Sequence, residues 1–208
     1  MELNIPSPVL QIQHLDFHFA THSVFRGCNL QFGPGITWLR GANGAGKTTL
    51  LKLAGGALLP ARGAIRLDDV DSGCMPLAYR ALAFYCGGDA PALPWLQVHE
   101  WLDLHLALYP GSDQSLLNDE LKAFTMTSTL QQSITALSLG QHKKLQLALA
   151  LALPVRLLLI DEPFNGLDAA AMAHLRARLA DPLRLARQCI VLTSHLAPDV
   201  PLAATVEI

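Results

Sequence analysis

A glycine-rich segment constrains the fold of this chain more than any other part of the sequence. Residues 41–49, GANGAGKTT, fit the pattern G-x-x-x-x-G-K-[ST]. A β-rich run at 35–39 precedes the segment, and a helix is expected from near Lys47 to about Gly55. In that context the glycines let backbone N–H groups surround phosphate oxygens, and the start of the helix adds partial positive charge. The phosphate contacts are expected from Asn43, Gly44, Ala45, Gly46, Lys47, Thr48 and Thr49.

Two side chains of this segment and two later acids have separate expected roles. Lys47 should bridge the β- and γ-phosphate oxygens of ATP during catalysis, and the Thr48 hydroxyl should reach Mg²⁺. Asp161 and Glu162 directly follow the aliphatic run 157–160, which is typical of a strand covered on both faces. Acids at the end of a buried strand are costly unless a metal or a water uses them. We expect Asp161 to hold Mg²⁺ and Glu162 to polarise the attacking water.

Strand-like and helix-like segments alternate along the chain. Strands are expected at 10–19, 28–32, 35–39, 64–67, 82–86, 156–160 and 189–194. Helices are expected at 47–55, on both sides of Pro110-Gly111, at 140–153 and at 169–186. This alternation predicts an α/β fold with a parallel sheet whose ligands bind at the carboxyl ends of the strands. The helical stretch at about 89–140 is predicted to be a subdomain inserted into a single domain of residues 1–208.

Composition excludes several other classes of protein. With 51% hydrophobic and 15% charged residues, the chain can bury one substantial core and is not a disordered tail. A net charge of -2 gives no general attraction to nucleic acid, so no nucleic-acid partner is expected. The four cysteines lack zinc-ligand spacing and indicate a reducing compartment. Residues 1–8 lack the basic start and apolar run of a secretory signal, so a cytoplasmic location is expected.

Residues 137–141, LSLGQ, resemble the signature of the ABC ATPase family. A serine N-cap beside a glycine is common by itself, but here it stands between the helical stretch and the acidic strand. The resemblance implies that the following helix presents a second phosphate-binding N-terminus. In the family's arrangement this helix end serves the nucleotide held by a second copy of the subunit. The nucleotide contacts implied by the resemblance are Ser138, Gly140 and Gln141.

Three further positions extend this resemblance over most of the chain. Residues 165–168, NGLD, resemble the family's D-loop, which implies a role for Asp168 at the nucleotide. Residues 193–195, TSH, end a strand as the family's switch histidine does, which implies that His195 contacts the γ-phosphate and orients the attacking water. Phe19 falls where the family places an adenine-stacking aromatic. Packing of Phe17 or Phe19 into the core stays open as the alternative, because both lie on one face of the strand.

The resemblance also implies a fold and a function. The fold is an ABC ATPase: a phosphate-loop NTPase core with a mostly parallel sheet, an N-terminal antiparallel β part and the inserted helical subdomain. The function is an ATP- and Mg²⁺-dependent motor that forms a homodimer and drives a separate membrane permease from the inner face of the cell membrane. Export is favoured over import. A non-transport ABC ATPase and a nucleotide-dependent regulator with low turnover stay open as alternatives.

The sequence departs from the family pattern in two places. The family has a glutamine in the loop before the helical subdomain, but no glutamine lies between Lys47 and Gln97, and the aligned position is Gly88. Either Asp89 supplies the missing ligand or nothing replaces it. Leu139 stands where the signature has its first glycine, a change we expect to be tolerated. The short chain, the altered loop and the segment Asp-Glu-Pro-Phe together resemble the haem-exporter ATPase of cytochrome c maturation.

Overall fold

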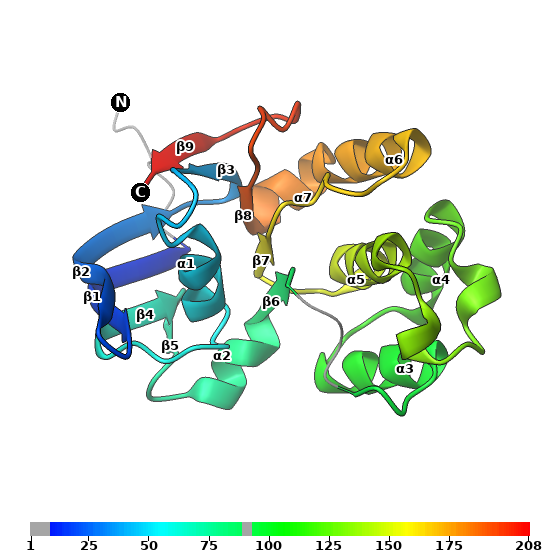
Figure 1. The fold of residues 1–208 in the computed structure, drawn as a ribbon, viewed down its shortest axis with the longest axis horizontal. Coiled ribbons are helices and arrows are strands. Elements are labelled where there is room, and N and C mark those ends of the chain that lie inside the picture. Colours follow the sequence, from blue (N-terminus) through cyan, green and yellow to red (C-terminus); the bar gives the residue numbers. More distant parts are fainter. Residues whose placement is uncertain (1–8, 89–92) are drawn as a thin grey trace.

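The computed structural model describes residues 9–88 and 93–208, and their strands form two sheets (Figure 1). The first sheet is antiparallel and has the order β2-β1-β4-β5. The second is parallel and has the order β6-β7-β8-β3-β9. The antiparallel strands are β1 (Leu10–Phe19), β2 (His22–Phe32), β4 (Arg62–Leu67) and β5 (Val70–Asp71). The parallel strands are β3 (Gly35–Arg40), β6 (Ala83–Cys86), β7 (Leu157–Ile160), β8 (Cys189–Thr193) and β9 (Ala204–Glu207).

Strands β7 and β8 of the parallel sheet divide the hydrophobic core into two parts. Successive side chains of a strand point to opposite faces of the sheet. Leu157 and Leu159 of β7 accordingly pack in one apolar cluster, with α1 (Lys47–Ala54) and the antiparallel strands. Leu158 and Ile160 pack in the other cluster, with α5 (Leu139–Ala152) and α6 (Ala169–Leu179). Because both faces are covered, β7 and β8 are buried throughout and consist of apolar residues up to Thr193.

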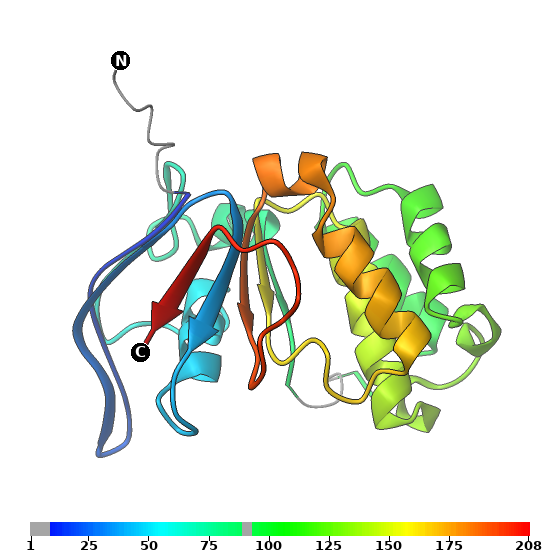
Figure 2. The ribbon, with the colours of Figure 1, turned by 90° about the horizontal axis from the view of Figure 1, so that it is seen from above.

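Figures 1 and 2 show how the helices are distributed about the parallel sheet. Helix α1 lies between the two sheets, whereas α3 (Val98–Leu108), α4 (Gln114–Ala123), α5 and α6 lie together on the opposite side. The two expected helices beside Pro110-Gly111 are therefore present. Two short 3₁₀ turns, Thr127–Thr129 and Ile134–Ala136, connect α4 to α5. Apolar residues of α3 and α4 join the same buried cluster as α5, and the limits of the subdomain stay a prediction.

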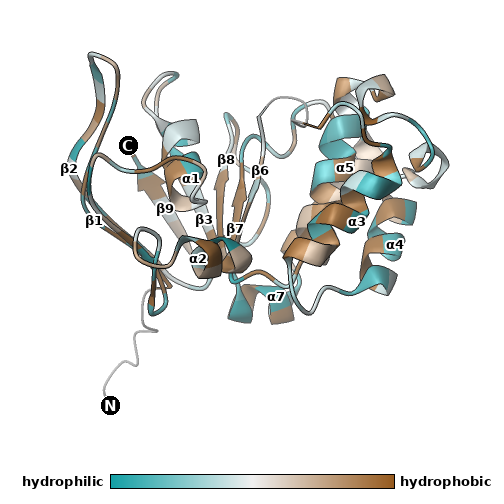
Figure 3. Cartoon of the chain, turned by 90° about the horizontal axis from the view of Figure 1, so that it is seen from below, coloured by the Kyte–Doolittle hydropathy of each residue, from teal (hydrophilic) through white to brown (hydrophobic). Residues whose placement is uncertain are grey.

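Hydropathy follows this layering. In Figure 3, β7 and β8 are brown, and the helices beyond the sheet show brown residues beside teal ones. Within the described residues, no helix combines the length and apolar character required to cross a bilayer.

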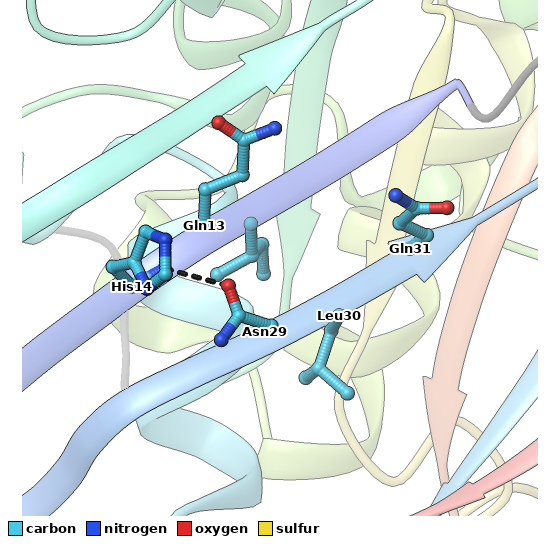
Figure 4. A pocket seen from close by; sticks show the side chains of 6 residues that line it. Gln13, His14, Asn29, Leu30 and Gln31 are labelled. Atoms are coloured by element: carbon cyan, nitrogen blue, oxygen red, sulfur yellow. Dashed lines mark hydrogen bonds between the residues drawn. The ribbon is translucent and has the colours of Figure 1, made fainter.

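The antiparallel sheet has an irregularity where β1 meets β2. The register shifts between Ile12 and Leu15, and His14 has a φ of 49°. The His14 backbone N–H is satisfied by the side chain of Asn29, whose Oδ1 accepts it at 2.9 Å (Figure 4). A side-chain acceptor therefore replaces the ladder partner that the irregularity removes.

Several sequence-based boundaries were wrong. A helix at 169–186 was expected, but Asp181 accepts from the Leu183 N–H and Pro182 starts a separate helix, α7 (Pro182–Arg187). Helix α2 (Pro76–Leu82) and strands β5 and β9 were missed because they are short or exposed. Strand β2 begins at His22 and not at Cys28, since the turn occupies only Ala20 and Thr21.

A buried carboxylate joins the helical stretch to α6. Glu120 of α4 is 2% exposed. Its Oε2 lies 2.7 Å from His174 Nε2, and its Oε1 accepts from Arg178 Nε at 2.5 Å. Both partners belong to α6 and keep about a quarter of their side-chain surface exposed. Removing the carboxylate would therefore leave His174 and Arg178 without this partner and only partly accessible to water.

We predict that Glu120→Ala lowers the free energy of unfolding by about 2–3 kcal/mol, a value below that of a fully buried pair because the partners are partly hydrated. Urea denaturation followed by circular dichroism measures this change. Asp119→Ala is the control, because its ion pair with Lys122 on the same helix is exposed and should contribute little. Equal losses for the two variants would contradict a special role for the buried acid.

Candidate functional site

The glycine-rich segment forms the connection between β3 and α1. Gly44 and Gly46 have φ values of 82° and 102°, in the region that favours glycine. A Cβ on Gly46 would lie 2.7 Å from Val24 Cγ1 and 2.9 Å from Phe25 Cζ. The loop therefore packs tightly on β2, and a side chain at Gly46 would push it away from that strand.

Lys47 begins α1 and turns back over the loop. Its Nζ donates to the carbonyl oxygens of Gly41 at 2.8 Å and Ala42 at 3.0 Å. Gly46, the N-cap residue, has no side chain to satisfy the first N–H groups of the helix. A cation and a helix N-terminus thus lie together at the loop, which is an arrangement that suits a phosphate.

Asp161 is the residue at which several elements meet. Its Oδ2 accepts from Thr48 Oγ1 at 2.6 Å and from the Tyr85 hydroxyl at 3.3 Å. Its Oδ1 accepts from Thr193 Oγ1 at 2.6 Å. Its backbone oxygen accepts from Lys143 Nζ at 2.7 Å. Side chains from α1, β6, β8 and α5 therefore fix this one residue, as its position directly after β7 requires.

Glu162 and His195 lie beside this carboxylate. Glu162 Oε1 is 3.6 Å from His195 Nε2, and the Glu162 backbone N–H donates to Thr193 Oγ1 at 2.9 Å. Glu162 has a backbone φ of 49°, which is uncommon for a residue other than glycine. Asn165 Nδ2 donates to its other carboxylate oxygen at 3.4 Å. The carboxylate is thus directed by two side chains and by a turn that the Thr193 hydroxyl stabilises.

A cavity of about 400 Å³ collects most of the predicted residues. Its lining comprises Asn43, Gly44, Gly46, Lys47, Thr48, Thr49, Asp161, Glu162 and His195. The hydroxyl of Thr48 and the carboxylate of Asp161 are hard oxygen donors on one wall. This donor set fits Mg²⁺, which takes one or two protein oxygens and completes its shell with phosphate and water. The cavity therefore brings the Lys47 cation, two oxygen donors that suit a metal and the Glu162 carboxylate into one space.

Another hollow, of about 420 Å³, lies on the antiparallel sheet between β1 and β2 (Figure 4). Its polar side chains are Gln13, His14, Asn29 and Gln31. None of these is a carboxylate, and the hollow has no glycine-rich loop, so the cavity beside Lys47 is the better candidate.

The signature residues lie away from this cavity. Ser138 is the N-cap of α5: its Oγ accepts from the Gln141 N–H at 3.2 Å, and Gln141 Oε1 accepts from the Ser138 N–H at 2.8 Å. A Cβ on Gly140 would lie 3.3 Å from the Gly166 carbonyl oxygen. Leu139, between Ser138 and Gly140, is 89% exposed. Figures 1 and 2 place α5 on the far side of the parallel sheet from α1, so this chain does not bring its signature to its own phosphate loop.

Three other predicted positions have defined surroundings. Asp168 is the N-cap of α6 and pairs with Lys144, and that hydrogen bond keeps the pKa of the Asp168 carboxyl below its usual value.

Phe19 is 50% exposed, whereas Phe17 is 8% exposed and packs against it edge-on. The core therefore takes Phe17, and stacking by Phe19 stays a prediction. Gly88 ends the described part of the loop after β6 with a φ of 84°, and Asp89 lies outside the described residues.

Three residues that the sequence patterns gave no role of their own also contact the site. Thr193 is fully buried and holds both Asp161 and the Glu162 backbone. Tyr85 and Lys143 reach Asp161 from β6 and α5. Thr193 had a usable signal, a polar residue at the end of an apolar strand, but the other two depend on how distant segments pack.

Comparison with known proteins gives consistent matches. The family model described as ABC transporter matches residues 25–165. The cytochrome c biogenesis ATP-binding export protein CcmA of Cupriavidus necator is 35% identical over 199 residues, which cover 92% of this chain and 85% of that relative. The taurine import ATP-binding protein TauB of Pseudomonas syringae pv. tomato is 32% identical, covering 95% and 76%.

A solved structure of an ATP binding subunit of an ABC transporter matches with a TM-score of 0.82 and 27% identity, over 90% of this chain and 80% of that one. A dimeric ABC transporter cassette matches at 0.76 with 18% identity, over 90% and 88%, and supports the fold alone. The family match spans the glycine-rich loop, the signature and the paired acids, so this chain belongs to the ABC transporter family as one of its ATP-binding, ATP-hydrolysing domains.

Proposed function

We propose that this protein is the motor subunit of an ABC transporter, which closes on ATP and Mg²⁺ as a homodimer and drives a separate membrane permease from the inner face of the cell membrane. One observation carries the proposal. The cavity unites Lys47, Asp161, Glu162 and His195, whereas Ser138 begins a helix outside it. A complete site then needs the signature of a second copy. The matched bacterial cassette of the same fold is itself a dimer, and a dimer of this chain is part of the proposal.

The residues of the cavity divide the work of hydrolysis. Lys47 and the loop N–H groups bind the β- and γ-phosphates and compensate for their charge. Glu162 accepts a proton from the water that attacks the γ-phosphorus, and His195 keeps that carboxylate and the water aligned. Thr48 and Asp161 hold Mg²⁺, which when bound neutralises the developing charge on the phosphate oxygens. Asn165 limits the rotation of Glu162 by donating to its second oxygen.

The remaining residues serve the interface between copies. Ser138, Gly140 and Gln141 complete the site of the partner copy with the N-terminus of α5. Gly140 allows the turn around Gly166 to lie against that helix, so that Asp168 and the signature are held together through Lys144. Leu139 is 89% exposed at the helix start, and the proposed dimer would cover it. Phe19 stacks on the adenine.

Export is the direction we infer, because the relative at 35% identity is named an export protein. The taurine relative, at 32% identity, is named an import protein, so the inference rests also on the altered loop at Gly88, which resembles that of the haem-exporter ATPase.

A regulator with low turnover is the second candidate, and the glycine at this position is the observation that favours it. Steady-state phosphate release separates the motor from the regulator.

We expect Glu162→Gln to lower ATP turnover by about 10²- to 10⁴-fold, because the amide keeps the shape but removes the base. ATP should stay bound, and light scattering should detect an ATP-dependent dimer. Glu100→Gln is the control: Glu100 accepts the Gln97 N–H at the start of α3, and a glutamine oxygen can still do so. Turnover in Glu162→Gln equal to that in the control would contradict the role of Glu162.

Mixing two inactive variants tests the composite site. Ser138→Arg should block the partner's γ-phosphate, and Lys47→Ala should remove the chain's own phosphate contact, so neither homodimer has an intact site. A mixed dimer keeps one intact site, formed by the loop of one variant and the signature of the other. Random pairing should restore about a quarter of wild-type turnover, since half of the dimers are mixed and each has one intact site of two. Absence of any restored phosphate release, with mixed dimers demonstrated by pull-down, would contradict the arrangement.

A further inference from the structure

We infer that Tyr85 is a positioning residue of the metal site: its hydroxyl orients the Asp161 carboxylate and links it to the last strand before the helical segment. The inference rests on the proposed function, because it gives Asp161 the role of metal ligand. No part of the sequence pattern singled out this residue.

The hydrogen bonds at Asp161 show why a further donor matters. Oδ1 is held by the buried Thr193 at 2.6 Å. Oδ2 is shared by Thr48 at 2.6 Å and Tyr85 at 3.3 Å. The Thr48 hydroxyl can donate to Oδ2 and coordinate Mg²⁺ through its own oxygen, so its position would also depend on the metal. Tyr85 is a second donor to the same oxygen and is not itself a proposed metal ligand, as is common for the partners of metal-ligating carboxylates.

The glycines after β6 make room for this contact. A Cβ on Gly87 would lie 3.0 Å from the Tyr85 hydroxyl oxygen and 2.6 Å from Asp161 Cβ. A Cβ on Gly88 would lie 3.7 Å from the same hydroxyl oxygen. The phenol thus occupies the space beside Asp161 that a side chain at either glycine would approach. Gly88 is the position predicted to replace the family's loop glutamine. Beside the metal-site acid, the polar oxygen near this glycine belongs to Tyr85, a residue earlier in the chain.

The other two tyrosines provide an internal comparison. A partly buried tyrosine normally finds some acceptor, so a hydrogen bond alone would not indicate a functional role. Tyr79 donates to the Ala54 carbonyl at 2.6 Å, and Tyr109 donates to the Ala83 carbonyl at 3.1 Å. Of the three tyrosines, all of which lie within the described residues, Tyr85 is the one whose hydroxyl is bonded to a carboxylate, and that carboxylate belongs to the nucleotide cavity.

The position of Tyr85 on β6 gives the contact a second consequence. The Asp161 backbone N–H also donates to the Cys86 carbonyl at 2.8 Å, so the end of β6 and Asp161 are joined through both backbone and side chain. Strand β6 is followed in the chain by α3. Asp161 is therefore in direct contact with the strand that leads into the helical segment.

The test compares Tyr85→Phe with Tyr109→Phe, which removes a hydroxyl at the end of α3 that donates to the β6 carbonyl of Ala83 and leaves Asp161 untouched. Binding of a fluorescent ATP analogue is titrated with Mg²⁺, and again in EDTA. We expect Tyr85→Phe to raise the Mg²⁺ concentration for half-maximal binding by about 10-fold, the lower end of the range for residues that hold a metal ligand. Binding in EDTA and the thermal midpoint should stay as in wild type. Electron paramagnetic resonance of Mn²⁺ should show the same weakening of metal binding, in a measurement that does not depend on ATP turnover.

Each other outcome overturns the inference in a recognisable way. If the Tyr85→Phe and wild-type Mg²⁺ titrations coincide, Tyr85 does not position the metal ligand, and the proposed function stands. If Tyr85→Phe loses binding in EDTA as well, its role is structural. If wild type itself shows no Mg²⁺ dependence, the metal site at Asp161 is wrong and the inference fails together with it.

Discussion

The structure depends on one charged residue at the end of a buried strand. Strand β7 is fully covered on both faces, and Asp161 follows it directly. An acid in that position is tolerated only if its oxygens are satisfied. Here Thr193, Thr48 and Tyr85 donate to them from three different elements. The hydrogen bonds that satisfy the Asp161 carboxylate therefore also hold it in one geometry with the phosphate loop and the neighbouring strands.

The covering of β7 explains why the chemistry collects at one edge. Alternate side chains of β7 and β8 enter two separate apolar clusters, one with α1 and one with the helical segment. The strands are held firmly by this double burial, so the polar residues at their carboxyl ends are placed reproducibly. Lys143 adds a connection from α5 to the Asp161 carbonyl oxygen, and thus the helix that begins with the signature is attached to the same point. The helix with the signature at its start and the nucleotide cavity therefore share a contact at Asp161.

Sequence patterns predicted the parts of this fold that local chemistry determines. The glycine-rich loop, the apolar strand with its two acids and the capped helix at Ser138 each have a short-range cause, and the structure contains these elements at the expected places. Helix α2 and strand β9 were missed because neither has a strong periodic apolar pattern: Tyr79 is the buried residue of α2, and β9 is mostly exposed. The break at Asp181-Pro182 was visible in the sequence but was overridden by the helical pattern around it. Tyr85 and Lys143 could not be predicted, since their relation to Asp161 exists only once β6, α5 and β7 have packed.

In the proposed dimer each subunit contributes half of each working site, so turnover should depend on protein concentration. Phosphate release by the wild-type protein is measured over a wide range of concentrations at saturating ATP and Mg²⁺, with the mass in solution followed by light scattering. Turnover per subunit should rise with concentration in step with the appearance of dimers. Turnover per subunit that stays constant down to concentrations where scattering detects only monomers would contradict a site shared between two subunits.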